Sequence, residues 1–189
     1  MSSSGVSKVD DGSARVTIWG EHLCQNGSNK EIVQPFPLDV NFGTPITVLQ
    51  VSCGFDHTLL LARVAEGVQK VFAWGKNSQG QLGVSRKVLR QAVDPFPLDN
   101  IGRNPDKVQC GARSSFVANE SGQVLAFGFN KNGQLGIGPS KSSVEEPSKV
   151  LFPDEKQRIT IVDIQCGFKH TVFVVEVGSQ IKLFGCGSN

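Results

Sequence analysis

Histidine and serine recur at one position of a short phrase and could in principle carry acid–base or nucleophilic chemistry. His57 and His170 occupy the same slot of a Gly-x-x-His phrase, and Ser114 stands in that slot between them. A catalytic group is needed once, whereas a structural group recurs with every repeat. A histidine nitrogen or a serine hydroxyl can satisfy nearby backbone groups. We therefore expect packing and hydrogen-bonding roles, and neither these residues nor His22 has a triad-like acid or an H-x-x-x-H partner.

The five cysteines show neither a metal-binding nor a redox pattern. They are Cys24, Cys53, Cys110, Cys166 and Cys186, and no two have C-x-x-C spacing. An odd count without a secretory signal argues against a disulfide framework and for a reducing compartment. Cys53, Cys110 and Cys166 lie in apolar segments typical of strands, so we expect them to be structural. Cys24 and Cys186 lie in turn regions and are expected to be more exposed.

Nucleotide and nucleic-acid chemistry receive little support. The chain has no G-x-x-x-x-G-K-[ST] loop, and GQLGIGPSK from Gly133 lacks the strand–loop–helix context of a phosphate site. No cofactor, metal ion or enzymatic activity is therefore predicted. A basic cluster is more consistent with a solvated loop than with contacts to DNA or acidic protein, because the net charge is only +2. The cluster comprises Arg86, Lys87, Arg90 and Arg103.

Length and composition indicate one globular unit. The chain has 189 residues, of which 39% are hydrophobic and 19% charged, so it can bury a core. No apolar run approaches the roughly 18 residues of a membrane-spanning helix, and the polar start lacks the apolar stretch of a signal peptide. We expect a protein of the cytoplasm, the nucleus or both, without a membrane partner.

The strongest feature of the sequence is repetition. Cys53, Cys110 and Cys166 are spaced 57 and 56 residues apart, within VSCGFDHTLLL, VQCGARSSFVA and IQCGFKHTVFV. A second phrase follows each, reading VFAWGKNSQGQLG, VLAFGFNKNGQLG and IKLFGCGSN, and VTIWGEHLCQNG opens the series. The aromatic-Gly pairs that we expect to be equivalent are Trp19-Gly20, Trp74-Gly75, Phe127-Gly128 and Phe184-Gly185.

Each repeat reads as about four short strands, because β-branched and aromatic runs alternate with turn-forming glycine and asparagine. Four-stranded units at a fixed period indicate propeller blades. The predicted fold is all-β, an incomplete propeller of about three to four four-stranded blades. Residues 1–15 are predicted to be a flexible polar segment, and residues 16–189 the repeat array. Its signature copies lie near 16–27, 51–83, 108–136 and 164–189.

These phrases resemble the regulator of chromosome condensation repeat family. The match rests on CGFDHTLLL with WGKNSQGQLG, CGARSSFVA with FGFNKNGQLG, and CGFKHTVFV with FGCGSN, and it covers roughly residues 16–189. The resemblance implies a propeller that closes with seven blades. The chain holds only about three to four blades, and three explanations of this smaller number of blades stay open. It is a fragment of a longer protein, an open fan of blades, or one half of a dimer whose two half-arrays complete a ring. Open blade edges also predict self-association.

Residues that vary between copies are the candidate contact residues, since loops carry the specificity of a rigid scaffold. After Cys-Gly the copies carry Phe55-Asp56, Ala112-Arg113 and Phe168-Lys169. We expect the polar member of each pair to lie at one end of the array, beside the loops that follow the aromatic-Gly. The predicted partner-binding set is Asp56, Arg113, Lys169, Lys76, Asn77, Phe129, Asn130 and Lys131.

The resemblance implies two functions. The first is a protein–protein interaction scaffold, as part of a regulatory or signalling adaptor. The alternative is guanine-nucleotide exchange on a Ran-like small GTPase, with chromatin association, although no basic tail is evident around Lys8 and Arg15, where Asp10 and Asp11 also lie. The ultraviolet photoreceptor of the same family is disfavoured, because its clustered tryptophans are absent from GFDHT and GFKHT.

Overall fold

The described residues of the computed structural model form four antiparallel sheets. The structure describes residues 3–8, 14–20, 32–38, 42, 45–138, 142–153 and 158–188. Side chains are described from Phe42 onward. Within this part the only helix is the short 3-10 turn η1 (Ala65–Gly67), so no described helix could cross a membrane. The prediction of an all-β fold is confirmed.

The sheets follow one another along the chain, and we call them blades 1 to 4. Blade 1 consists of β1 (Ser3–Lys8), β2 (Ala14–Gly20) and β3 (Ile32–Leu38). Blade 2 consists of β4 (Thr47–Cys53), β5 (His57–Arg63), β6 (Gln69–Lys76) and β7 (Gln91–Pro97). Blade 3 consists of β8 (Pro105–Cys110), β9 (Ser114–Asn119), β10 (Val124–Phe129) and β11 (Ser143–Lys149). Blade 4 consists of β12 (Ile159–Cys166), β13 (His170–Val177) and β14 (Gln180–Gly187).

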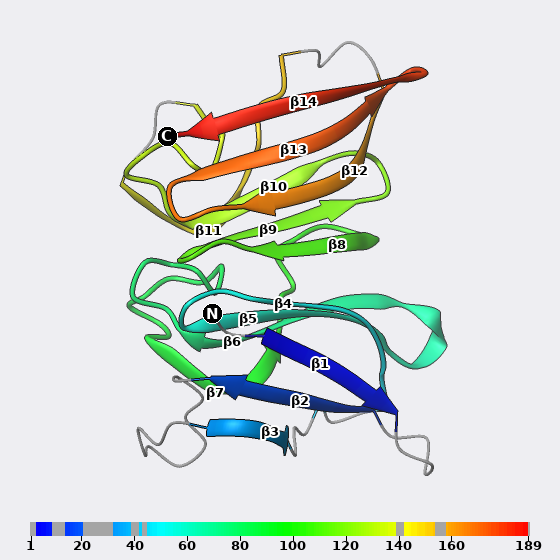
Figure 1. The fold of residues 1–189 in the computed structure, drawn as a ribbon, viewed down its shortest axis with the longest axis vertical. Coiled ribbons are helices and arrows are strands. Elements are labelled where there is room, and N and C mark those ends of the chain that lie inside the picture. Colours follow the sequence, from blue (N-terminus) through cyan, green and yellow to red (C-terminus); the bar gives the residue numbers. More distant parts are fainter. Residues whose placement is uncertain are drawn as a thin grey trace.

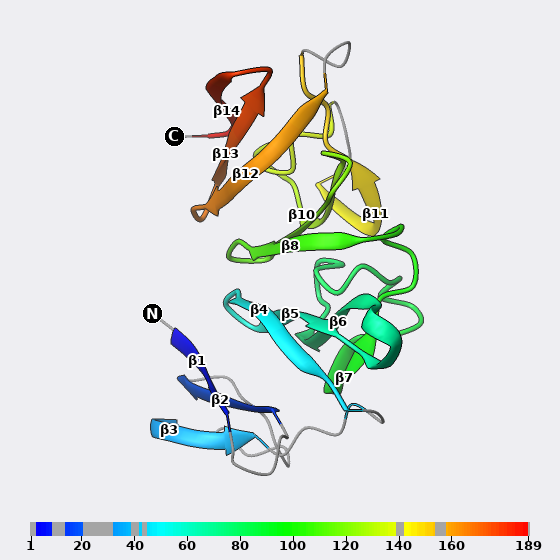
Figure 2. The ribbon, with the colours of Figure 1, turned by 90° about the vertical axis from the view of Figure 1, so that its right-hand side faces the viewer.

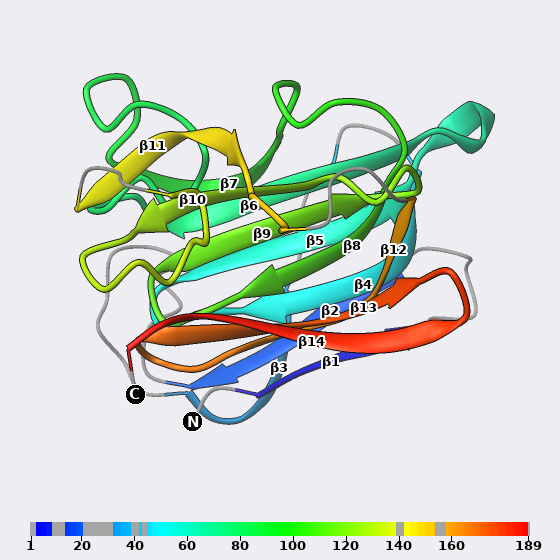
Figure 3. The same ribbon diagram turned by 90° about the horizontal axis from the view of Figure 1, so that it is seen from above.

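The blades stack into an arc with blade 1 at one end and blade 4 at the other (Figures 1 and 2). Seen from above, the strands of successive blades lie over one another with a gradual rotation (Figure 3). Every blade is a meander in which sequential strands pair, and β4, β8 and β12 are the first strands of their blades. The arc of repeated sheets confirms an incomplete propeller.

Two recurring bulges put the four blades in register with one another. The first recurs in blades 2 to 4, where the pairing shifts between Val48 and Gln50 in β4, between Pro105 and Lys107 in β8, and between Ile161 and Asp163 in β12. The second recurs in blades 1 to 3. The pairing shifts between Ile18 and Gly20 in β2, between Ala73 and Gly75 in β6, and between Ala126 and Gly128 in β10. Blade 1 therefore presents the second to fourth strands of the repeat, and blade 4 presents the first to third. The described part also differs from the predicted boundary: β1 lies within residues 1–15, which we had expected to be flexible, and pairs along its length with β2.

The same comparison corrects our alignment of the last phrase. Gly75 pairs with His57 and Gly128 pairs with Ser114, but the residue that pairs with His170 is Gly187. Gly187 also has the φ of 106° that Gly75 has, close to the 103° of Gly128. The equivalent of the aromatic residue is therefore Cys186, and Phe184-Gly185 lies two positions too early.

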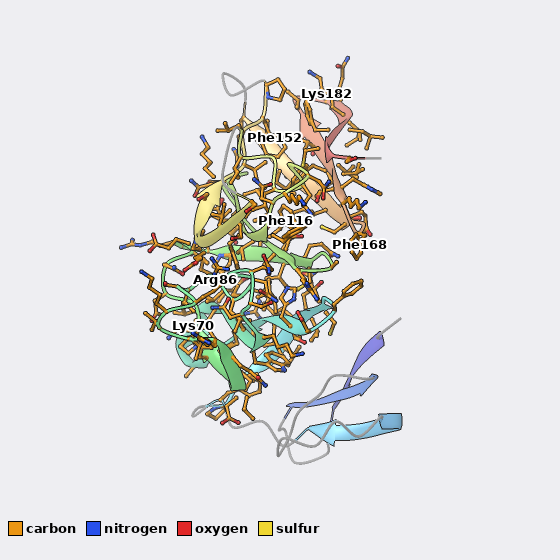
Figure 4. All side chains as sticks on the ribbon, turned by 90° about the vertical axis from the view of Figure 1, so that its left-hand side faces the viewer. Lys70, Arg86, Phe116, Phe152, Phe168 and Lys182 are labelled. Carbon is orange, nitrogen blue, oxygen red and sulfur yellow. The ribbon has the colours of Figure 1, made fainter. Side chains whose placement is uncertain are left out.

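Apolar contacts between blades form the core. One cluster joins blade 2 to blade 3 and includes Leu59, Leu60 and Trp74. A second cluster joins blade 3 to blade 4, where the ring of Phe173 packs edge-on against Phe116, labelled in Figure 4, at a centroid distance of 5.8 Å. Burial of these side chains is the main stabilising term, because each fully buried large apolar side chain contributes about 1.5–3 kcal/mol.

Blade 4 keeps one face open. Leu183 on β14 is 69% exposed, whereas Val71 and Val124, in the same slot of blades 2 and 3, are 0% and 1% exposed. Val71 and Val124 are buried because they belong to the apolar clusters between blades, whereas Leu183 belongs to neither cluster. Self-association through the open edges stays a prediction, and light scattering on a sizing column tests it.

Candidate protein-contact site

Three identical turns present the predicted contact residues. In each turn, Cys-Gly-x-x-His in blades 2 and 4 and Cys-Gly-x-x-Ser in blade 3, the glycine N–H donates to the carbonyl three residues later: Gly54 to His57 at 2.8 Å, Gly111 to Ser114 at 2.8 Å, and Gly167 to His170 at 2.9 Å. A Cβ on Gly54 would collide with the His57 ring, so only glycine fits there. The turns lie at the same end of blades 2, 3 and 4, on the left of Figure 1.

A second loop binds each turn through the backbone. The N–H groups of Lys76, Phe129 and Ser188 donate to the carbonyls of Asp56, Arg113 and Lys169 at 2.7, 2.9 and 3.0 Å. The glycine that precedes each donor has a positive φ near 105°, which lets the strand end approach the turn closely. The predicted residues of the two loop types thus lie side by side in blades 2 and 3, and in blade 4 Ser188 lies beside the predicted Lys169.

Two of the predicted residues meet between blades. The guanidinium Nε of Arg113 lies 3.8 Å from Asp56 Oδ2, and Gln81 Nε2 donates to Asp56 Oδ1 at 2.9 Å. The Asp56 side chain is 9% exposed and that of Arg113 is 49% exposed. Asp56 therefore anchors the surface from below, while Arg113 remains accessible to a partner.

Asn77 and Asn130 do not belong to the surface, and their inclusion in the predicted set was wrong. Asn77 is 0% exposed and Asn130 is 5% exposed. Asn77 Nδ2 donates to the carbonyls of Val84 and Leu89, and its Oδ1 accepts from the Leu82 N–H at 3.0 Å. Asn130 Oδ1 receives the Leu135 N–H at the same distance. Both side-chain amides stabilise the conformation of their loop, because they form hydrogen bonds with buried backbone groups of that loop.

The remaining predicted residues keep accessible positions. Lys76, Lys131 and Lys169 are exposed, and Phe129 is half-buried. Of the basic cluster, Lys87, Arg90 and Arg103 are exposed, as a solvated loop requires, whereas Arg86 is paired. Arg86, labelled in Figure 4, donates from Nε to Glu145 Oε1 of blade 3 at 2.7 Å, and this hydrogen bond lowers the pKa of Glu145 to about 2. Arg86 therefore joins two blades.

Sequence reasoning missed an interior layer of glutamines beneath the turns. Gln81 and Gln134, of the two GQLG phrases, are 0% and 2% exposed. The Gln81 carbonyl accepts from Ser115 Oγ at 2.7 Å, and the Gln134 carbonyl accepts from Thr171 Oγ1 at 2.9 Å. The recurrence of GQLG was the signal that could have identified them as buried.

His57 lies in the interior between two blades, and His170 lies at the surface. His57 is 3% exposed and its Nε2 lies 2.9 Å from Ser115 Oγ of the next blade. Because that hydroxyl donates its proton to Gln81, it accepts from His57 Nε2–H. Burial lowers the pKa of His57 to about 4, although the Asp56 charge opposes the shift. His170 is exposed, and His22 lies outside the described residues.

The cysteines of the described part are free thiols without metal-binding neighbours. Burial raises the pKa of Cys166 to about 12 and that of Cys110 well above its usual value. Cys186 is also half-buried, and burial raises its pKa to about 11, so it is less exposed than we expected. Cys24 lies outside the described residues. These thiols are not activated nucleophiles, because reactivity requires the thiolate.

Sequence reasoning also passed over the apolar members of the turns. Phe55 and Phe168 are 55% and 59% exposed, and their ring centroids are 5.4 Å apart. Phe168 lies at the inner side of the arc in Figure 4. Their identical slots were visible in the repeats, but contact between them depends on how the blades stack.

Comparison with known proteins agrees with this geometry. The family described as "Regulator of chromosome condensation (RCC1) repeat" matches residues 70–118 and 121–174, which is more than half of the chain. Two human proteins are similar. The probable E3 ubiquitin-protein ligase HERC3 is 39% identical over 75% of this chain, and the probable E3 ubiquitin-protein ligase HERC6 is 32% identical over 93% of it. The chain spans only 13% and 16% of these relatives.

Solved structures show the same architecture. Yeast RCC1 (Prp20), in its complex with Kap60, superposes with a TM-score of 0.70 and 26% identity over 92% of this chain and 38% of its own. Human WBSCR16 gives a TM-score of 0.73 at 24% identity, over 96% of this chain and 46% of its own, and shows the shared fold. The matched repeats, the four blades and their recurring Cys-Gly turns together establish that this chain belongs to the regulator of chromosome condensation (RCC1) repeat family.

Proposed function

We propose that this chain is a protein-interaction scaffold that binds its partner through the turn end of blades 2 to 4, in a regulatory or signalling adaptor of the cytoplasm or nucleus. The proposed contact surface consists of Lys76, Arg113, Phe129, Lys131 and Lys169, and Asp56 supports it by pairing with Arg113 from beneath. It acts by binding rather than by catalysis. Protein binding is the coarse role that its family membership supports.

One observation carries the proposal: the backbone of the turns is constant while their exposed side chains differ. The three pairs of loops share the same hydrogen bonds to within 0.3 Å, yet present aspartate, arginine and lysine at one position. Structural residues recur in such an array, so divergent residues at a rigid, accessible position are free to determine which partner binds. A rigid platform also reduces the entropy lost on binding.

Site-specific photocrosslinking tests the proposal directly. A photoreactive amino acid replaces Lys169, and the full chain is irradiated in an extract of the cells that produce it. We expect covalent adducts with a discrete set of proteins, lost when Lys76 and Arg113 are both changed to alanine. The matched control places the same group at Ser121, in the exposed hairpin between β9 and β10 at the opposite end of blade 3. Equal adducts from Lys169 and Ser121 would contradict the proposal.

The second candidate function is guanine-nucleotide exchange on a Ran-like small GTPase. It is favoured by the likeness to Prp20p of Saccharomyces cerevisiae, whose crystal structure was reported with its binding properties to Gsp1p and histones. The chain covers 39% of that protein, with a TM-score of 0.68. Release of labelled GDP from Gsp1p tests exchange, and retention on immobilised histones tests chromatin association. Exchange no faster than in buffer would leave the scaffold role alone.

A further inference from the structure

The two exposed phenylalanines come from blades that are not neighbours. Phe55 lies in the turn between β4 and β5 of blade 2, and Phe168 lies in the turn between β12 and β13 of blade 4. Their rings nevertheless pack at 5.4 Å with an angle of 54° between planes. The contact spans blade 3, so it reflects the stacking of three successive turns.

Blade 3 makes this contact possible through a small residue. Ala112 occupies the slot of the two phenylalanines in the turn between β8 and β9. The Phe55 N–H donates to the Ala112 carbonyl at 2.9 Å, which holds the first turn against the second. A methyl group in the middle leaves room for the flanking rings to meet, and a third aromatic side chain there would occupy the space of their contact.

The pair stays accessible despite its internal contact. Phe55 is 55% exposed and Phe168 is 59% exposed, whereas Phe116, Phe127 and Phe173 of the blade interfaces are at most 2% exposed. Exposed aromatic rings that are already held in place are typical anchors of protein interfaces, because they bury large apolar area and lose little conformational entropy.

Basic side chains lie in the same turns as the aromatic pair and in the loops bound to these turns. The turns and the loops bound to them carry four basic residues that are exposed, Lys76, Arg113, Lys131 and Lys169. Asp56 is the acidic residue of these segments, and its two oxygens already face Gln81 and Arg113. The accessible charge of these turns and loops is therefore positive, and they also carry an exposed apolar pair, which together complement an acidic segment with an apolar residue.

We propose that the Phe55–Phe168 pair receives an apolar side chain of an acidic segment of the partner protein, and that the surrounding lysines and Arg113 bind its carboxylates. The inference rests on the scaffold function proposed above and adds the chemistry of the partner. Apolar contact supplies the anchor, and the charges select acidic over basic sequences and accelerate association.

Synthetic peptides test the proposal without a known partner. The probe is a short fluorescent peptide of aspartate and glutamate with one central leucine, and binding is followed by fluorescence anisotropy. Two comparison peptides change one property each: alanine replaces the leucine, or lysine and arginine replace the acids. We expect the leucine peptide to bind the full chain at least about tenfold more tightly than the alanine peptide, a difference of about 1.4 kcal/mol. Affinity should fall as salt is raised.

Variants locate the site. Phe168→Ala should weaken binding of the leucine peptide at least about tenfold and leave the alanine peptide unchanged. Lys169→Gln and Arg113→Gln should weaken both acidic peptides. Matched controls lie at the opposite end of blade 2: Val68→Ala removes another exposed apolar side chain, and Lys70→Gln removes a lysine from the other end of β6. Neither control should change the affinity, and thermal melting confirms that each variant is folded.

Three results would overturn the inference: no binding of the leucine peptide, equal binding of the leucine and alanine peptides, or equal binding by the wild type and Phe168→Ala. Photocrosslinking separates this failure from failure of the scaffold function. Adducts from position 169 that persist in Phe168→Ala would keep the turn end as the contact surface and reject the aromatic anchor. Absence of adducts specific to position 169 when Phe168 is unchanged would reject the scaffold function itself.

Discussion

His57 of blade 2 donates a hydrogen bond from Nε2 to Ser115 Oγ of blade 3 at 2.9 Å, and that hydroxyl donates to the Gln81 carbonyl at 2.7 Å. The chain of bonds crosses the blade interface directly beneath the contact surface. Gly54 lies against the imidazole, so a side chain at that position would displace it. A residue that looks catalytic by type thus holds two blades together.

This arrangement predicts a pH-dependent stability. Burial lowers the pKa of His57 from 6.5 in the unfolded chain to about 4 in the folded one. The unfolded state therefore binds more protons between these values, and stability is lost as pH falls from about 6.5 to 4. We expect a loss of up to about 3 kcal/mol in the free energy of unfolding over this window. Urea denaturation at a series of pH values measures it.

The control is His57→Gln, which can still donate to Ser115 and does not titrate. Its stability curve should lack the part of the slope that His57 contributes between pH 6.5 and 4. Identical slopes for wild type and variant would show that His57 is not the titrating group.

The corrected register predicts opposite outcomes for two glycines of β14. At Gly187, with φ of 106°, an added Cβ would collide with the Lys169 carbonyl oxygen. At Gly185 the nearest atom to such a Cβ is the Thr171 carbonyl oxygen at 4.0 Å. We expect Gly187→Ala to cost about 2–3 kcal/mol of stability and Gly185→Ala to stay within about 0.5 kcal/mol. Chemical denaturation of both variants decides between the registers, and the reverse order would restore the alignment on Gly185.

Sequence repetition was sufficient to predict the fold because the strand-forming runs and their glycine turns are local signals. It failed at the last phrase because Gly185 and Gly187 flank Cys186, and an aromatic residue precedes the first of them. Only the pairing of β14 with His170 shows which glycine makes the close approach. The four-strand pattern was also incomplete for residues 3–8, whose polar sequence gave no sign of a strand.

The candidate site was predictable in position and less so in membership. The variable residues at matching slots lie at one end of the blades, as period and turn chemistry predict, and their binding role stays a prediction. Asn77 and Asn130 were misassigned because polarity was taken for exposure, whereas the loop closes around their amides. The contact of Phe55 with Phe168 depends on the stacking of three blades and on the small Ala112, which no local pattern encodes.

Asn77→Ala tests the loop-folding role. The substitution leaves the Leu82 N–H and two carbonyls without the amide that they bind, inside a buried loop. We expect a cost of about 2–4 kcal/mol in the free energy of unfolding, since buried unpaired groups each cost about 1–3 kcal/mol. The neighbouring exposed Lys76→Ala serves as the control and should change stability by less than about 0.5 kcal/mol. Equal effects of the two substitutions on the free energy of unfolding would contradict the loop-folding role of Asn77 and indicate that its side chain is exposed.

The thiols provide a last prediction, on accessibility and reactivity together. Burial raises the pKa of Cys166 to about 12 and of Cys186 to about 11, and it raises that of Cys110 as well. Iodoacetamide reacts with thiolates, so at pH 8 these three sites should be alkylated far more slowly in the folded chain than in urea. Mass spectrometry of the digested protein reports each site separately. A folded chain in which Cys110 reacts as fast as in urea would contradict its burial between blades 2 and 3, where its Sγ donates to the Ser52 carbonyl at 3.2 Å.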